Sequence, residues 1–210
     1  MLAGRLHAYA HRPDVMVLAL PRGGVPVAAE VAAALDAPLD VFVVRKLGVP
    51  GQEEYAMGAI ASGGVTVLND QTIAAMNIQQ REIDAVIARE TAELARREAL
   101  YRERVAAPDV RGRVVILVDD GLATGSTMQA AATALRKMEP ARIVVAVPVA
   151  APQACAVLDH VADECITALT PDPFYGVGLW YDDFTQTSDA EVRALLQAAR
   201  DRTAAASATS

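Results

Sequence analysis

The chain has 210 residues and a net charge of −7, from 19 Lys and Arg against 26 Asp and Glu. A hydrophobic share of 53% excludes an intrinsically disordered chain, and the acidic balance argues against nucleic acid or an anionic membrane as the main partner. The sequence contains neither an apolar signal core nor an apolar run of the roughly 18 residues that span a bilayer, so we expect a cytoplasmic protein.

Two residue types are rare. Only two of the 19 cations are lysines, Lys46 and Lys137. The two cysteines, Cys155 and Cys165, lack the spacing of a metal or redox motif, and we expect buried thiols in a reducing compartment. The acid excess is concentrated near the C-terminus, because residues 151–210 carry 9 acids and only 3 cations.

Apolar runs and helical patterns alternate along the chain. The runs predict strands at Val15–Leu20, Leu39–Val44, Tyr55–Ala61, Val65–Leu68, Arg113–Asp120, Arg142–Val147 and Glu164–Leu169. Helices are predicted at Val25–Leu35, Asp70–Met76, Gln79 to about Arg104, Ser126–Met138, Pro152–His160 and from Ser188, its N-cap, onward. This alternation predicts a single α/β domain over 1–210 with a doubly wound, mostly parallel sheet. We expect 203–210 to fray.

The segment of about 70–104 is a predicted helical insertion. Its long helix carries Glu93/Arg97 and Glu98/Arg102 with the favourable i,i+4 order. About 26 residues of helix would measure about 39 Å, which is longer than a small domain needs. The helix therefore either projects or pairs with another subunit, or it covers one side of a sheet as a solvated helix.

Three polar loops that contain glycine follow predicted strands, at 21–24, 45–54 and 119–127. Ligands of parallel sheets bind at the carboxyl ends of the strands, which makes these loops candidate binding elements. The loop 21–24 places a glycine pair beside Arg22, a combination suited to a pyrophosphate, although an ordinary glycine turn would look the same.

The third loop carries the most specific chemistry, in the sequence VVILVDDGLATGST (114–127). Its tail, Thr124–Thr127, offers backbone N–H groups, a helix N-terminus and three hydroxyls to a phosphate monoester. Asp119 and Asp120 would repel a phosphate, but they suit vicinal hydroxyls, directly or through Mg²⁺. A phosphate and a diol on one loop describe a ribose 5-phosphate, so a structural domain without a ligand is a poor interpretation.

Competing motifs are absent from the sequence: there is no Walker A loop, no G-x-G-x-x-G after the first strand, no G-x-S-x-G and no H-E-x-x-H. VVILVDDGLATGST resembles the phosphoribosyl pyrophosphate (PRPP) signature of type I phosphoribosyltransferases. The segment order resembles that family over nearly the whole chain. The resemblance implies the type I phosphoribosyltransferase fold, with PRPP and pyrophosphate as ligands, Mg²⁺ as cofactor and a homodimer.

The resemblance also implies roles for residues of the three loops. Asp119 and Asp120 would hold the ribose hydroxyls and Mg²⁺, and Arg45 and Lys46 would begin a flexible loop that brings cations to the pyrophosphate. These four are the predicted catalytic residues. The remaining predicted PRPP contacts are Arg22, Gly23, Gly24, Ala123, Thr124, Gly125, Ser126 and Thr127.

A C-terminal segment, mainly 170–187, is similar to the hood that holds the nitrogenous base in this family. Four of the nine aromatic residues lie within FYGVGLWYD (174–182), where stacking on a heterocycle and a small apolar core are both possible. The resemblance implies base contacts by Phe174, Tyr175 and Val177, and a metal or base contact by Asp182.

Departures from the family leave the acceptor open. Ala123 stands where 6-oxopurine enzymes place an acid, and no lysine follows Lys137, which argues against hypoxanthine and guanine. The phosphate loop is more similar to adenine and orotate enzymes. The resemblance therefore implies transfer of the phosphoribosyl group of PRPP to an unidentified base, or the reverse. The alternative is a non-catalytic PRPP or nucleotide sensor on the same fold.

Overall fold

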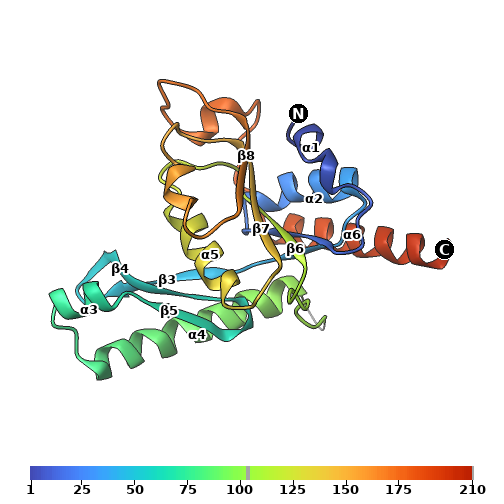
Figure 1. The fold of residues 1–210 in the computed structure, drawn as a ribbon. Coiled ribbons are helices and arrows are strands. Elements are labelled where there is room, and N and C mark those ends of the chain that lie inside the picture. Colours follow the sequence, from blue (N-terminus) through green and yellow to red (C-terminus); the bar gives the residue numbers. More distant parts are fainter. Residues whose placement is uncertain (103–104, 210) are drawn as a thin grey trace.

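The chain is described here by a computed structural model, which covers residues 1–102 and 105–209. Its centre is a five-stranded parallel sheet with the order β2-β1-β6-β7-β8 (Figure 1). The strands are β1 (Val15–Ala19), β2 (Leu39–Val41), β6 (Val114–Val118), β7 (Arg142–Val149) and β8 (Glu164–Leu169). The predicted α/β fold with a doubly wound parallel sheet is confirmed.

Both faces of this sheet are buried, which explains its uninterrupted apolar strands. Along β1, Val15 and Val17 join the core on one face, whereas Met16 and Leu18 join the core on the other. The first face is covered by α1 (Leu2–Arg5), α2 (Gly24–Leu35) and α6 (Asp189–Thr209), and the second by α5 (Ser126–Arg136). Every residue of β1 is therefore in contact with one of two cores.

The chain order of the sheet changes direction between β1 and β6. From β1 the chain continues to β2 on one side, and from β6 it continues to β7 on the other. The loops after β1 and β6 thus diverge at their shared carboxyl edge, which is where open α/β sheets bind ligands. These are the loops 21–24 and 119–125.

A second, antiparallel sheet contains β3 (Val44–Val49), β4 (Gln52–Ala61) and β5 (Val65–Leu68). The β4–β5 hairpin confirms the sequence prediction. The prediction of a polar loop at 45–54 is wrong, because this segment forms most of β3, a turn at Pro50-Gly51 and the start of β4. Leu47 and Val49 are buried, and pairing with β4 satisfies the backbone of the polar residues.

The long helix α4 (Gln80–Arg102) lies along the small sheet on the side away from α5 (Figure 1). It follows the short α3 (Asp70–Ala75) and buries Ile83, Val86, Leu94 and Tyr101 in the first core. In the described part of the chain, this packing supports the second interpretation, a helix that covers one side of a sheet. Residues 103 and 104, the expected end of the helix, lie outside the described residues.

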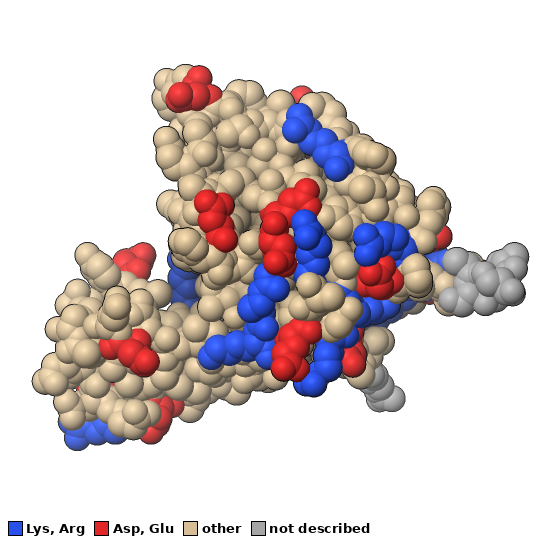
Figure 2. All heavy atoms as spheres, in the orientation of Figure 1, with Lys and Arg blue, Asp and Glu red and all other residues tan. Residues whose placement is uncertain are grey.

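The long helix carries both predicted i,i+4 ion pairs, and Arg102 of the second pair is buried. Glu93 bonds Arg97 at 2.9 Å, and Glu98 bonds Arg102 at 2.6 Å, both at the predicted i,i+4 spacing. On the face shown in Figure 2, cations and acids alternate and no broad basic area is present. Among the described residues, no helix is long and apolar enough to cross a membrane.

The region after β7 departs from the sequence predictions. Only Ala156–Leu158 is helical, as one 3₁₀ turn (η3), where a helix over Pro152–His160 was expected. The expectation of two buried thiols is also wrong, because Cys155 and Cys165 form a disulfide that joins this segment to β8. Their Cα atoms lie 6.0 Å apart, a normal separation for a disulfide.

The hood (170–187) and the last helix complete the chain. Val177–Trp180 forms a 3₁₀ turn (η4) in the hood. Ser188 caps α6 as predicted, accepting the Glu191 backbone N–H at 3.2 Å. This helix continues to Thr209, and the fraying of 203–210 stays a prediction.

Candidate active site

The two divergent loops touch at the carboxyl edge of the large sheet. A Cβ atom on Gly23 would collide with the carboxylate of Asp120. A Cβ atom on Gly24 would lie 2.7 Å from the Val118 carbonyl oxygen and 2.8 Å from Asp119 Cα. Only glycine allows this approach, so the glycine pair predicted to bind pyrophosphate lies directly against the acidic pair predicted to bind ribose.

The acidic pair is partly buried and lacks a cationic partner among the described side chains. Asp119 Oδ1 accepts the backbone N–H of Asp120 at 2.9 Å. Burial, and next the charge of Asp120, raise the pKa of Asp119 to about 8. Burial also raises the pKa of Asp120. The ionised form of the pair is therefore disfavoured in the absence of a ligand, and a divalent cation or hydroxyl donors would stabilise it.

The predicted phosphate-binding residues form the N-terminal end of α5. Thr124 Oγ1 lies 3.2 Å from Ser126 Oγ and 3.4 Å from the Ser126 nitrogen. Gly125 has a φ of +74° and packs against Ala154, whose carbonyl oxygen would be 3.0 Å from an added Cβ atom. Ala123, Thr124 and Thr127 are exposed. An anion would meet the exposed hydroxyls of Thr124 and Thr127 and the positive end of the helix dipole here.

The structure separates the two predicted cations of the second loop. Lys46 Nζ donates to Ser126 Oγ at 3.1 Å and so lies beside the phosphate loop. Arg45 instead bonds Glu90 of α4 through Nε at 2.8 Å and Nη2 at 2.6 Å. Burial raises the pKa of Glu90, but hydrogen bonds from Arg45 and Arg89 outweigh it and lower the pKa below its ordinary value. Arg45 is thus occupied by a structural ion pair.

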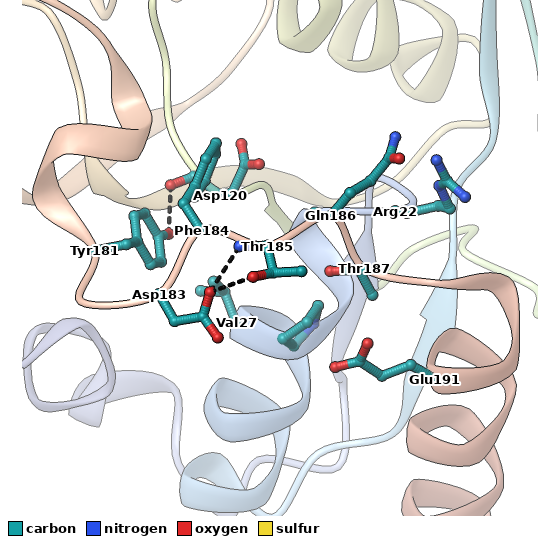
Figure 3. Close-up of a pocket in the computed structure, with 12 residues that line it drawn as sticks. Arg22, Val27, Asp120, Tyr181, Asp183, Phe184, Thr185, Gln186, Thr187 and Glu191 are labelled. Atoms are coloured by element: carbon teal, nitrogen blue, oxygen red, sulfur yellow. Dashed lines mark hydrogen bonds between the residues drawn. The ribbon is translucent and has the colours of Figure 1, made fainter.

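A cavity of about 640 Å³ opens beside the acidic loop (Figure 3). Arg22, Gly23 and Asp120 line it, and these three were predicted site residues. The other lining residues come from α2, the hood and the start of α6, namely Pro26, Val27, Tyr181, Asp183, Phe184, Thr185, Gln186, Thr187 and Glu191. In Figure 3, Asp120 and Arg22 lie at opposite ends of the cavity.

Arg22 is the cation of this cavity. Its Nη1 lies 3.9 Å from Asp189 Oδ1, a loose contact that leaves the guanidinium available to an anion. Asp189 is held in place by Tyr101, whose hydroxyl donates to the same oxygen at 2.7 Å. Tyr101 belongs to α4, so the inserted helix supports the Arg22 end of the cavity.

The hood is attached to the acidic loop. The Tyr181 hydroxyl donates to the Asp120 carbonyl oxygen at 2.6 Å, and the rings of Tyr181 and Phe184 lie 5.1 Å apart. Val177, a predicted base contact, packs against Gly121, where an added Cβ atom would be only 2.7 Å from Val177 Cγ1. Tyr181 and Phe184 are not among the predicted site residues, although Tyr181 belongs to the aromatic segment 174–182 and Phe184 follows it closely.

Other predicted hood contacts lie away from this cavity. Phe174 and Tyr175 are not among its lining residues, and the exposed fraction of Tyr175 is 79%. Asp182 is exposed and outside the lining, whereas its neighbour Asp183 lines the cavity. Asp183 Oδ1 accepts hydrogen bonds from the backbone and hydroxyl of Thr185, at 2.8 and 2.5 Å.

The donor set of the acidic loop fits Mg²⁺. Two adjacent carboxylates provide hard oxygen ligands, and no group of three or more acidic, histidine or cysteine side chains forms a metal cage in the described parts of the chain. Mg²⁺ is commonly bound by one or two carboxylates together with substrate oxygens and water. Asp119 and Asp120 could therefore hold the ion jointly with a ligand.

Three comparisons found known proteins that are similar to this chain. A family model described as the phosphoribosyl transferase domain matches residues 1–182. Two Mycobacterium tuberculosis proteins, "Putative phosphoribosyl transferase MT0597" (strain CDC 1551) and "Putative phosphoribosyl transferase Rv0571c" (strain H37Rv), are 47% identical over 185 residues. The matches cover 88% of this chain, but the chain spans only 42% of the length of either relative.

The crystal structure of the protein TT1426 from Thermus thermophilus is similar over most of both chains. It superposes with a TM-score of 0.82 and 42% sequence identity, covering 93% of this chain and 92% of that chain.

Proposed function

Because this chain belongs to the phosphoribosyl transferase domain family, we propose that it transfers the phosphoribosyl group of PRPP to a nitrogenous base and releases pyrophosphate. The observation that carries this proposal is the direct contact between the loops 21–24 and 119–125. The contact brings a candidate pyrophosphate site, a candidate diol site and a candidate phosphate site to one edge of the sheet. PRPP carries these three groups on a single ribose.

Each part of PRPP has a matching part of the site. Asp119 and Asp120 accept the ribose hydroxyls, and the hydroxyls and N–H groups of 123–127 receive the 5-phosphate. Arg22, with backbone N–H groups of the loop 21–24, holds the pyrophosphate. The anomeric carbon then faces the hood, whose Val177 packs on the acidic loop.

The reaction needs positioning and charge stabilisation more than covalent chemistry. The lone pair of a ring nitrogen forms the new bond to the anomeric carbon, while the bond to pyrophosphate breaks and its electron pair leaves with that group. Asp119 and Asp120 place negative charge near the ribose as positive charge develops there. Arg22 stabilises the departing polyanion. Bound Mg²⁺ would supply further neutralisation of the pyrophosphate charge.

Calorimetry with PRPP and MgCl₂ tests the proposed ligand. We expect the wild-type chain to bind, and Asp119→Asn with Asp120→Asn to weaken binding about a hundredfold or more, because charged hydrogen-bond acceptors are lost. Asp159→Asn with Asp172→Asn is the matched control, since it removes the same charge from two exposed positions. Equal affinity of the two double variants would contradict the assignment.

Release of pyrophosphate in a screen of purine and pyrimidine bases tests the activity and identifies the acceptor. Tight PRPP binding with no release for any base would support the alternative, a PRPP sensor. A cytoplasmic location and a homodimer remain expectations, and analytical ultracentrifugation of the purified chain would measure the second.

A further inference from the structure

We infer that Lys46 binds the 5-phosphate end of the ligand and not its pyrophosphate, an assignment that rests on the proposed function. The resemblance alone placed Lys46 with Arg45 in a mobile loop that closes over the pyrophosphate. The contacts of β3 place the two side chains at separate sites.

The strand geometry separates the neighbouring cations. Successive side chains of a strand point to opposite faces of the sheet. Arg45 points to the face covered by α4, where it bonds Glu90, and Lys46 points to the face covered by α5. A single movement of β3 cannot direct both side chains at one pyrophosphate.

Lys46 already lies at the candidate phosphate site. One of its three N–H donors is used by Ser126 Oγ, and Ser126 is the first residue of α5. The side chain is otherwise exposed, so further donors are free for an anion held by Thr124, Ser126 and Thr127. A phosphate monoester placed there would receive a charge-assisted hydrogen bond from the ammonium group.

The small sheet is held in this position at both ends of α5. Lys46 bonds Ser126 at the start of the helix, and Lys137, just past its end, bonds the Thr66 carbonyl oxygen at 3.0 Å. The only two lysines of the chain therefore link the same sheet to the same helix. On the opposite face, the Arg45–Glu90 pair links β3 to α4.

The pyrophosphate end of the site has a cation of its own. Arg22 and Gly23 line the 640 Å³ cavity, and Lys46 does not. Lys46 and Ser126 line a different cavity of about 260 Å³, between the small sheet and α5. The two cations are thus assigned to the two ends of PRPP.

Separate titrations with ribose 5-phosphate and with magnesium pyrophosphate test the assignment. Lys46→Ala should weaken ribose 5-phosphate binding about tenfold or more and change pyrophosphate binding less than about twofold, because only the first ligand loses a charged donor. Lys46→Arg should retain most of the affinity. Lys137→Ala is the matched control, because it removes the other link to α5 away from the site and should leave both affinities unchanged.

The outcomes separate this inference from the proposed function. If Lys46→Ala weakens pyrophosphate binding and spares ribose 5-phosphate, Lys46 contacts the leaving group and the inference is wrong. If Lys137→Ala causes the same loss as Lys46→Ala, the effect comes from the position of the sheet, and the inference is again wrong. A wild-type chain that binds neither PRPP nor ribose 5-phosphate would overturn the proposed function as well.

Discussion

The hydroxyl of Tyr181 donates a hydrogen bond of 2.6 Å to the carbonyl oxygen of Asp120, which ties the hood to the acidic loop (Figure 3). Burial raises the pKa of Tyr181, and the nearby charges of Asp120 and Asp119 raise it further. The hydroxyl therefore keeps its proton throughout the neutral range. It can serve as a permanent donor that holds the backbone of Asp120 in place.

Tyr181→Phe should lower the free energy of unfolding by about 1 kcal/mol, because the carbonyl oxygen of Asp120 loses a partly buried donor. The affinity for PRPP with Mg²⁺ should also fall, as the acidic loop becomes less restricted. Tyr175→Phe makes the same change at an exposed hood position and should affect neither quantity. Urea unfolding and calorimetry measure the two effects. If Tyr181→Phe changes neither the free energy of unfolding nor the PRPP affinity, the hydrogen bond does not position the loop.

Gly24→Ala should destabilise the chain by about 1–3 kcal/mol, because its Cβ atom would overlap the backbone at Val118 and Asp119. Displacement of Asp119 should also weaken PRPP binding. Gly4→Ala serves as control, because Gly4 lies in the helix α1 with no atom near its missing Cβ. That substitution should be neutral or slightly stabilising in thermal unfolding. Similar melting temperatures for both variants would argue against the close contact of the loops.

Asp119→Asn should stabilise the ligand-free chain as the pH rises. The pKa of Asp119 is raised from 3.8 to about 8, so the folded state retains a proton that the unfolded state loses between these values. Wild-type stability therefore falls as the pH increases through this window, and the asparagine variant lacks this loss. The Tm advantage of Asp119→Asn should grow from pH 5 to pH 8 and shrink in MgCl₂. A pH-independent difference would exclude this cause.

Glu90→Gln should destabilise the chain at pH 7 by about 1–3 kcal/mol, because a buried carboxylate bonded to Arg45 and Arg89 is lost. The pKa of Glu90 is lowered in the folded state, so its contribution is present above its ordinary value of about 4.5 and is lost as the pH falls further. The Tm gap between wild type and Glu90→Gln should therefore close below about pH 4.5.

Glu93→Gln is the matched control for this measurement. Glu93 also bonds two arginines, Arg96 and Arg97, but its side chain is 29% exposed, against 8% for Glu90. Exposed ion pairs contribute little to stability, so this variant should melt close to the wild type. Equal losses from the two substitutions would show that burial of Glu90 is not what makes its ion pair important.

The order of elements could be predicted from local patterns, and so could the loop that carries Asp119 and Asp120. Apolar runs such as β1 and β6 have few alternatives to burial in a parallel sheet, and a capping residue such as Ser188 defines the start of its helix. The acidic pair and the hydroxyl run that follows it are contiguous in the sequence. Their chemistry is therefore visible without a fold.

Several other features depend on contacts between distant segments. Segment 45–54 forms strands because β4 pairs with it and α4 covers it, although its composition resembles a loop. The pairing of Cys155 with Cys165 depends on where the irregular turn after β7 lies against β8. In the same way, Tyr181 enters the site because the hood folds back onto Asp120.

The sequence by itself determined the α/β fold and the residue types of the candidate phosphate and diol sites, since strand burial and loop chemistry are encoded over short stretches. Only the tertiary structure decided the positions of the cations. Arg45 and Lys46 are neighbours with equal charge, yet the pleat of β3 directs one to Glu90 and the other to Ser126. The face that each side chain meets depends on which helix covers it, and that packing joins segments far apart in the chain.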